Sequence, residues 1–257
     1  MKPNQQDLNR HRMSTNYNAI AREYQASKML PWRKHIESYT FFQVVGDLSN
    51  LHVLDLACGE GFYTRQIKLR GAAEVVGVDI SDGMIQLAKE AEAQNPLGLV
   101  YHCQDALLLN LDQKFDLICA TYLLNYAQTA DELFRMGQVI ANHLKPGGRF
   151  VTINSNPDYQ AAVEAMFPYG FTRENADYSE GAEITWRFYQ SDMSHIAVTN
   201  YHLAKSTHET ALSQAGLSAI QWHAVEASPE GVAAHDEGYW NAIVSSQPII
   251  GLSASKA

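Results

Sequence analysis

The chain has 257 residues and a formal net charge of −9, from 19 Lys plus Arg against 28 Asp plus Glu. This length suits one large domain with an insertion, and the negative charge argues against nucleic acid and anionic membrane surfaces as partners. No window approaches the roughly 18 consecutive apolar residues of a membrane span, and the first 16 residues are polar without a signal-peptide pattern. We therefore expect a soluble, cytoplasmic protein that acts on a small molecule.

The cysteines and histidines give no sign of a metal site or a disulfide framework. Cys58, Cys103 and Cys119 fall in or at the ends of predicted strands, and their odd number and spacing indicate reduced thiols. The ten histidines include no HxxxH pair, and the sequence has no CxxC. We therefore expect no bound metal.

Apolar runs of strand length alternate with helical patterns through the first 155 residues. The predicted strands are HVLDLA (52–57), EVVGVDI (74–80), LVYHC (99–103), FDLICAT (115–121) and RFVTIN (149–154). Helical patterns cover 82–94, where Asp82 is the predicted cap, and 130–143. This alternation predicts an α/β fold with a parallel sheet covered on both faces. Ligands of such sheets bind at the carboxyl ends of the strands.

A glycine-rich loop follows the first predicted strand, in the stretch DLACGEGFYT (55–64). A dinucleotide loop usually has a third glycine where this chain has Thr64, so a ligand without a pyrophosphate fits better. S-adenosylmethionine (SAM) is such a ligand, and Gly59 and Gly61 would let the backbone approach it closely. Asp79 ends the next strand, 18 residues after Gly61, where a carboxylate accepts both hydroxyls of a ribose. That spacing alone is common to NAD and SAM.

The sequence resembles the class I SAM-dependent methyltransferases from about Tyr17 to Asn154, through VLDLACGEGFYT, VVGVDIS, QDA and LKPGGRF in family order. The resemblance implies a seven-stranded, doubly wound, Rossmann-like α/β sheet, which the apolar stretches 218–225 and 249–255 would complete. It implies SAM as the cofactor, with the methionine moiety near Asp55, Ala57, Gly59 and Gly61, the ribose and adenine near Asp79 and Ile80, the adenine edge near Asp105 and Ala106, and the sulfonium near Ala120 and Tyr122. Without the resemblance, Asp55 would bind loop amides and Asp105 would cap a helix.

A narrower resemblance is to bacterial small-molecule methyltransferases, including the azapteridine N-methyltransferases of toxoflavin biosynthesis. It is carried by the stretches YNAIAREYQ (17–25), SKMLPWR (27–33), GEGFYTR (59–65) and YLLNYA (122–127). It implies that residues 1–35 form a polar tail and a helix that covers the cofactor, and that residues 36–257 form the methyltransferase domain.

Three residues of this N-terminal segment are candidates for the cofactor's carboxylate. The resemblance implies that Tyr17 and Tyr24 donate hydroxyls to it and that Arg33 pairs with it. The alternatives are an amphipathic helix packed on the sheet for the two tyrosines, and a solvent-exposed position for Arg33.

Residues 155–205 form a predicted insertion that is rich in aromatic residues. ITWRFYQ (184–190) and IAVTNYH (196–202) alternate apolar and polar positions, which predicts a β-hairpin cap after the fifth strand. A methyl acceptor needs a dry cavity, so we expect it to contact Trp186, Phe188 and Asn200 there, together with Asn125 and Asn154 of the core. The alternatives for the aromatic residues are hairpin core and the contact of a homodimer. Ser206 and Glu209 form a predicted capping box for the helix that follows.

We therefore predict a methyltransferase that acts on nitrogen or oxygen of a small, aromatic or heteroaromatic metabolite. A ring nitrogen with a free lone pair needs no base, whereas a hydroxyl or carbon acceptor does; His202 is the first candidate, with His195 and Glu164 behind it. The alternatives are a C-methyltransferase, an NAD-dependent oxidoreductase and a noncatalytic SAM-binding module whose insertion docks a partner. A diphosphate-bearing acceptor is disfavoured because the insertion offers only Arg173, Arg187 and Lys205.

Overall fold

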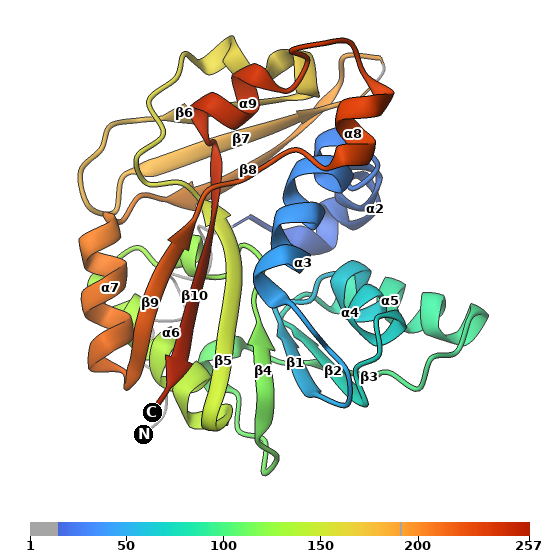
Figure 1. Ribbon diagram of the computed structural model, residues 1–257, viewed down its shortest axis with the longest axis vertical. Coiled ribbons are helices and arrows are strands. Elements are labelled where there is room, and N and C mark those ends of the chain that lie inside the picture. Colours follow the sequence, from blue (N-terminus) through green and yellow to red (C-terminus); the bar gives the residue numbers. More distant parts are fainter. Residues whose placement is uncertain (1–14, 191) are drawn as a thin grey trace.

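The computed structural model describes residues 15–190 and 192–257, so the first 14 residues of the predicted polar tail lie outside the described residues. A seven-stranded sheet forms the centre of the molecule, in the order β3-β2-β1-β4-β5-β10-β9 (Figure 1). Strands β1 to β5 are parallel, and β10 is antiparallel to both β5 and β9. The predicted Rossmann-like sheet is confirmed, with strands β1 (His52–Leu56), β2 (Glu74–Asp79), β3 (Val100–Cys103), β4 (Phe115–Cys119), β5 (Leu144–Ser155), β9 (Leu217–His223) and β10 (Ile249–Lys256).

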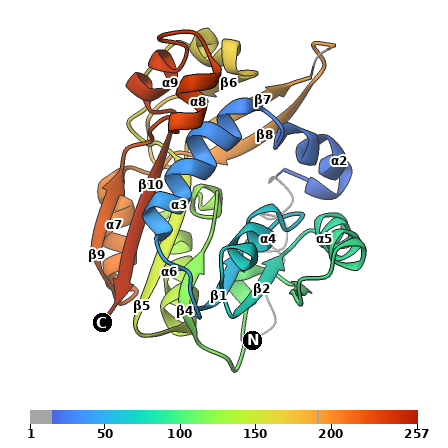
Figure 2. The same ribbon diagram turned by 45° about the vertical axis from the view of Figure 1, so that its right-hand side comes forward.

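The two faces of the sheet are separated by the alternation of side chains along each strand. On β1, Val53 belongs to one buried cluster with Phe41 and Ile67, whereas Leu54 belongs to a second with Leu133. Helices α3 (Tyr39–Val45), α4 (Phe62–Leu69) and α5 (Asp82–Gln94) cover the first face. Helices α6 (Ala130–His143) and α7 (Lys205–Gln214) cover the second, and Figure 2 turns the molecule so that these layers can be followed.

Helix α5 has the bounds that the sequence pattern predicts, but its cap is a different residue. Its N-cap is Ser81, whose Oγ accepts a hydrogen bond from the Met84 amide at 3.2 Å, so the prediction of Asp82 as the cap is wrong. Ser81 Oγ also donates to Asn18 Oδ1 at 2.7 Å, and Asn18 accepts from the Gly83 amide at 3.0 Å. Through these bonds α2 (Tyr17–Ser27), the expected covering helix, is attached to the start of α5.

The predicted capping box of α7 is also wrong. The helix begins at Lys205, so Ser206 lies inside it, and Glu209 instead accepts from the Trp222 indole at 2.8 Å. The first turn is closed by Glu180, which accepts from the Thr207 hydroxyl at 2.7 Å and from the Ala204 amide at 3.2 Å. The local pattern predicted a cap from within the helix, but a carboxylate from a distant loop supplies it.

A second, three-stranded antiparallel sheet lies beyond the carboxyl end of β5 (Figure 1). Its strands β7 (Glu183–Tyr189) and β8 (His195–Tyr201) pair where the sequence predicts a hairpin. Strand β6 (Phe171–Asn175) was not predicted, because only five residues separate its turn signals and its alternation is weak. Shorter elements complete the chain: the π-helix η1 (Arg33–Ser38), the 3₁₀ helices η2 (Ala106–Leu108), η3 (Leu124–Tyr126) and η4 (Val163–Tyr169), and the helices α8 (Pro229–Ala234) and α9 (Asn241–Ser246).

Three further observations apply to residues 15–190 and 192–257. The three cysteines are free, with Cys58 and Cys119 buried and Cys103 exposed. Within those ranges no group of three or more His, Cys, Asp or Glu side chains is arranged to hold a metal ion. No helix in that part of the chain has the length and apolarity to cross a membrane.

The cap of α5 gives a stability prediction. Ser81→Ala should lower the free energy of unfolding by about 1 kcal/mol, because the Met84 amide loses its partner and α2 loses one bond to α5. Asp82→Ala is the matched control and should cost less, since Asp82 contributes only a favourable charge in the first turn. Denaturant unfolding of both variants checks this, and a larger loss in Asp82→Ala would contradict the assignment of the cap.

Candidate functional site

In the loop after β1, every second residue from Ala57 to Gly61 has a positive φ angle. Ala57, Gly59 and Gly61 have φ of 61°, 55° and 81°, in a backbone region that residues other than glycine rarely adopt. A Cβ on Gly59 would meet nothing within 4 Å, so its backbone is open to a ligand. A Cβ on Gly61 would lie 2.5 Å from the Tyr101 hydroxyl. Packing inside the protein therefore explains Gly61, whereas Gly59 keeps the open approach that the sequence predicts.

A cavity of about 200 Å³, called the strand-end cleft here, lies at the carboxyl ends of β1, β2 and β3. It brings together six residues that the sequence predicts at the cofactor: Tyr17, Ala57, Asp79, Ile80, Asp105 and Ala106. Ile80 is 58% exposed, so an apolar surface faces the cleft rather than the core. A carboxylate beside an apolar surface suits a nucleoside, whose sugar is polar and whose base is flat and weakly polar.

The two aspartates of the strand-end cleft also hold the surrounding backbone. Asp79 accepts from the Gly59 amide and from the Ser81 amide, both at 2.8 Å, and so ties the end of β2 to the loop after β1. Burial raises the pKa of Asp79 above its usual range, although these two hydrogen bonds oppose the shift. Asp105 caps η2 through the Leu107 amide at 2.8 Å, so the capping role and the position in the cleft both hold.

Asp55 lies at the end of β1 and is fully buried. Its Oδ2 accepts from the Thr64 hydroxyl at 2.6 Å, whereas Oδ1 has no hydrogen-bond partner among the described residues. Asp55 is thus bound to a side chain of α4 and not to loop amides, which was the alternative. Burial raises the pKa of Asp55 to about 7, so its charge changes near neutral pH.

A second cavity, called the aromatic chamber here, lies between the N-terminal helices and the β6–β8 sheet. Besides Asn200, it contains six of the predicted residues from the cofactor and acceptor sets on facing walls: Tyr17, Tyr24, Arg33 and Tyr122 on one side, Trp186 and Phe188 on the other. Asn200 also lines it, and the sequence did not single out the remaining lining residues Trp32, Tyr126 and Val198. Its volume is about 20 Å³, enough for one water molecule, so a larger ligand requires these side chains to move.

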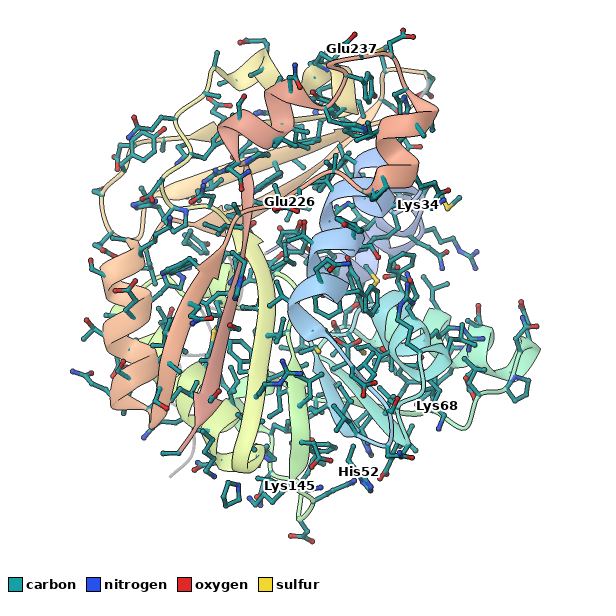
Figure 3. All side chains as sticks on the ribbon, in the orientation of Figure 1. Lys34, His52, Lys68, Lys145, Glu226 and Glu237 are labelled. Carbon is teal, nitrogen blue, oxygen red and sulfur yellow. The ribbon has the colours of Figure 1, made fainter. Side chains whose placement is uncertain are left out.

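Arg33 is buried in this chamber with 1% of its side chain exposed, so the alternative of a surface charge is wrong. The next residue, Lys34, is 63% exposed and pairs with Glu230 at the periphery of the molecule (Figure 3). The Arg33 guanidinium lies 4.4 Å from the ring centre of Trp32 and 4.8 Å from that of Phe188. Its Nη1 donates to Glu37 Oε2 at 2.5 Å, and within the described chain Nε and Nη2 have no hydrogen-bond partner.

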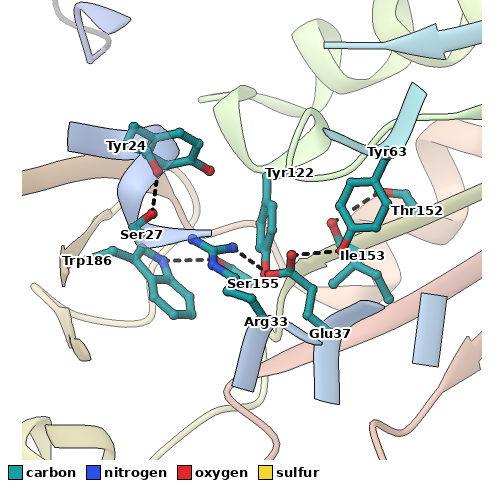
Figure 4. A network of polar contacts seen from close by, with 10 residues as sticks. All are labelled: Tyr24, Ser27, Arg33, Glu37, Tyr63, Tyr122, Thr152, Ile153, Ser155 and Trp186. Atoms are coloured by element: carbon teal, nitrogen blue, oxygen red, sulfur yellow. Dashed lines mark hydrogen bonds and ion pairs between the residues drawn. The ribbon is translucent and has the colours of Figure 1, made fainter. Parts of the chain in front are cut away.

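Glu37 is a residue that the sequence analysis missed. It is fully buried and accepts from Arg33 of its own helix, from the Tyr63 hydroxyl at 2.8 Å and from the Tyr122 hydroxyl (Figure 4). Burial would raise the pKa of Glu37, but the Arg33 charge and these hydrogen bonds hold it below its usual range. For Arg33, burial lowers the pKa and the Glu37 charge more than offsets it, so both groups are ionised. The available signal was an Arg and a Glu four residues apart within one helical turn.

Tyr17 and Tyr126 line both cavities, and their hydroxyls are hydrogen bonded to each other. Tyr17 comes from α2 and Tyr126 from η3, so this bond joins the covering helix to the segment after β4. Tyr126 was not predicted, although it lies in the YLLNYA stretch. The strand-end cleft and the aromatic chamber are therefore neighbours that share a wall of two phenols.

Ala120, Asn125, Asn154 and His202, which the sequence also predicts at the site, line neither cavity. Ala120 is buried at the end of β4, where its carbonyl accepts from the Thr152 hydroxyl. Asn125 and Asn154 are buried, and within the described chain neither side-chain amide has a hydrogen-bond partner. His202 packs against Tyr178, with ring centres 5.7 Å apart, and burial lowers its pKa. The structure does not bring His202 into the aromatic chamber with Asn200.

Known proteins match the chain in its sequence and in its fold. Residues 53–148 match a family model described as a methyltransferase domain. A ubiquinone biosynthesis O-methyltransferase of Coxiella burnetii (strain Dugway 5J108-111) is 33% identical over 168 residues, which cover 61% of this chain and 67% of the relative. The structure of a SAM-dependent methyltransferase from Clostridium acetobutylicum has a TM-score of 0.63 at 19% identity, with 95% of this chain and 100% of that chain covered. The DhpI-SAM-HEP complex has a TM-score of 0.60 at 16% identity, with 93% of both chains covered.

The strand-end cleft gives a binding prediction. Asp79→Ala should weaken SAM binding at least about tenfold, because the variant loses a carboxylate that holds the glycine loop and that is predicted to accept from the ribose. Asp116→Ala is the control: its carboxylate accepts from His52 and Lys145 at the opposite end of the sheet. Isothermal titration of both variants checks this, and unchanged SAM binding in Asp79→Ala would place the ribose elsewhere.

Proposed function

Because the chain belongs to the SAM-dependent methyltransferases and its cofactor is SAM, we propose that it methylates a nitrogen or oxygen of a small aromatic or heteroaromatic metabolite. The observation that carries this proposal is the shared wall between the strand-end cleft and the aromatic chamber. With its nucleoside in the strand-end cleft, SAM would direct its sulfonium toward Tyr17 and Tyr126, and thus toward an acceptor in the aromatic chamber.

The residues of the two cavities fit the cofactor in shape and charge. Asp79 and Ile80 suit the ribose and adenine, and the open backbone at Gly59 leaves room for the chain beyond the sugar. At the amino-acid end, Asp55 Oδ1 suits an ammonium group, and Arg33 Nε and Nη2 suit a carboxylate, since none of these atoms has a hydrogen-bond partner in the described chain. Tyr17 and Tyr24 stand beside Arg33 as further donors for that carboxylate.

The aromatic chamber supports a flat acceptor. Trp186 and Phe188 are stacked on each other, with ring centres 6.1 Å apart, and both face the N-terminal wall. Rings of this kind bind a planar substrate by stacking, while Asn200 supplies a polar group that orients it. The buried amides of Asn125 and Asn154, which lack partners in the described chain, would add donors and acceptors once a ligand is present.

Methyl transfer needs alignment more than proton transfer. SAM supplies the electrophilic methyl group, so the protein holds the acceptor in line with it and keeps water out. The groups that line the chamber are tyrosines, an arginine, an asparagine and apolar side chains, and His202 lies outside that lining. This favours a ring nitrogen with a free lone pair, such as that of a toxoflavin-type azapteridine, or a hydroxyl that is already ionised. The name of the Coxiella relative supports an oxygen acceptor as the second candidate.

A metabolite screen scored by release of S-adenosylhomocysteine tests the proposed function. We expect turnover with planar N-heteroaromatic or phenolic compounds and none with aliphatic alcohols. Trp186→Phe should then raise the KM for the acceptor several-fold with little change in SAM affinity. The substitution keeps an aromatic ring in the chamber but removes the indole N–H that donates to Ser155. An equal loss of both affinities would show that the β6–β8 sheet serves only as scaffold.

The pKa of Asp55 predicts a pH dependence of cofactor binding. Since this pKa is raised to about 7, the carboxyl group is largely neutral below that pH and no longer attracts an ammonium group. The Kd of S-adenosylhomocysteine should therefore rise toward about tenfold per pH unit below 7 and level off above it. Asp55→Asn should bind weakly with a flat profile between pH 5.5 and 8. A wild-type profile that is equally flat would contradict the role of Asp55.

A further inference from the structure

We propose that Glu37 is a positioning residue: it holds the Arg33 guanidinium so that its free edge takes the carboxylate of the cofactor's amino-acid end. This inference rests on the proposed function, because it assumes that the aromatic chamber receives that end of SAM. It adds a residue that touches neither cofactor nor acceptor but determines which part of the cofactor the site can recognise.

The first step is the division of the five N–H groups of Arg33. Glu37 takes Nη1 at 2.5 Å, which leaves Nε and Nη2 without a partner in the described chain. These two nitrogens form one side of the planar guanidinium, and that side presents two parallel N–H groups to a carboxylate. Figure 4 shows the guanidinium between Glu37 and the Trp186 ring.

The second step is that Glu37 is itself held from three elements. Arg33 comes from η1, Tyr63 from α4 directly after the glycine loop, and Tyr122 from the segment after β4. Tyr122 has a φ of 63°, a strained backbone conformation, and its hydroxyl donates to Glu37. A carboxylate with both oxygens fixed in this way leaves the guanidinium little freedom to rotate.

The third step is the cost of an arginine that is only half satisfied. Arg33 and Glu37 are both buried, and unpaired buried donors are unfavourable, so a pair built only for stability would leave none. Lys28, whose Nζ lies 5.6 Å from the Tyr63 ring centre, adds positive charge near the same group. The region is thus arranged to accept one more negative charge.

The test compares two ligands that differ in the amino-acid end. S-adenosylhomocysteine carries the carboxylate and the ammonium group, whereas 5′-methylthioadenosine has the same nucleoside and thioether without either. In the wild type we expect S-adenosylhomocysteine to bind at least tenfold more tightly. In Glu37→Gln that preference should fall at least threefold, since only the part that Asp55 contributes remains, with the affinity for 5′-methylthioadenosine unchanged within threefold. Glu92→Gln is the control, since it discharges an ion pair with Arg65 at 2.8 Å outside both cavities and should keep the preference.

A second variant covers the case in which Glu37→Gln does not fold. Combining Arg33→Met with Glu37→Met removes both buried charges together, and such a replacement by apolar side chains is usually tolerated. This variant should show the same fall in the preference for S-adenosylhomocysteine while still binding 5′-methylthioadenosine.

The outcomes separate this inference from the proposed function. An equal loss of both ligands in Glu37→Gln would make Glu37 a scaffold residue, and an unchanged preference would make it irrelevant; either result overturns the inference and leaves the methyltransferase function intact. A wild type that binds both ligands equally would overturn the inference and the placement of the amino-acid end in the chamber. A wild type without turnover on any acceptor in the metabolite screen would count against the proposed function alone.

Discussion

The buried ion pair of Arg33 and Glu37 is the constraint around which the site is organised. Two opposite charges inside a protein are costly to desolvate, and a short contact between them only partly compensates that cost. The pair therefore contributes little net stability, but it demands further donors around Glu37. Tyr63 and Tyr122 supply them, and in doing so they bring α4 and the segment after β4 against η1.

This constraint connects the two halves of the molecule. The central sheet provides the strand-end cleft, as parallel α/β sheets do at the carboxyl ends of their strands. The N-terminal helices and the β6–β8 sheet provide the aromatic chamber. Tyr63 and Tyr122, which hold Glu37, come from the sheet side, whereas Arg33 lines the aromatic chamber. A substitution on one side would therefore alter contacts on the other. The chemistry of the site thus depends on elements that are far apart in the chain.

The parts that the sequence could predict are those set by local patterns. Continuous apolar runs identified the strands, and the glycine loop with the strand ending in Asp79 led to residues that line the strand-end cleft, because side-chain alternation and backbone freedom are local properties. Contacts between distant residues were missed or misjudged. The Glu180 cap of α7 lies in another loop, and the burial of Arg33 depends on partners that only the fold brings together. The cap residue Ser81 also bonds to Asn18 of α2, a contact that the local pattern does not show.

The hydrogen bond between Tyr17 and Tyr126 bears on the rates at which the cofactor binds and leaves. Both residues line the two cavities, so in the proposed binding mode a conformation that admits the whole cofactor would have to give up this contact and shift α2, which Asn18 tethers to α5. The fraction of molecules in that open conformation scales the observed affinity, so part of the binding free energy is spent on opening. Once the cofactor has taken the place of the phenol contact, the same helix would retain it, and departure of the demethylated product would then set the pace of turnover.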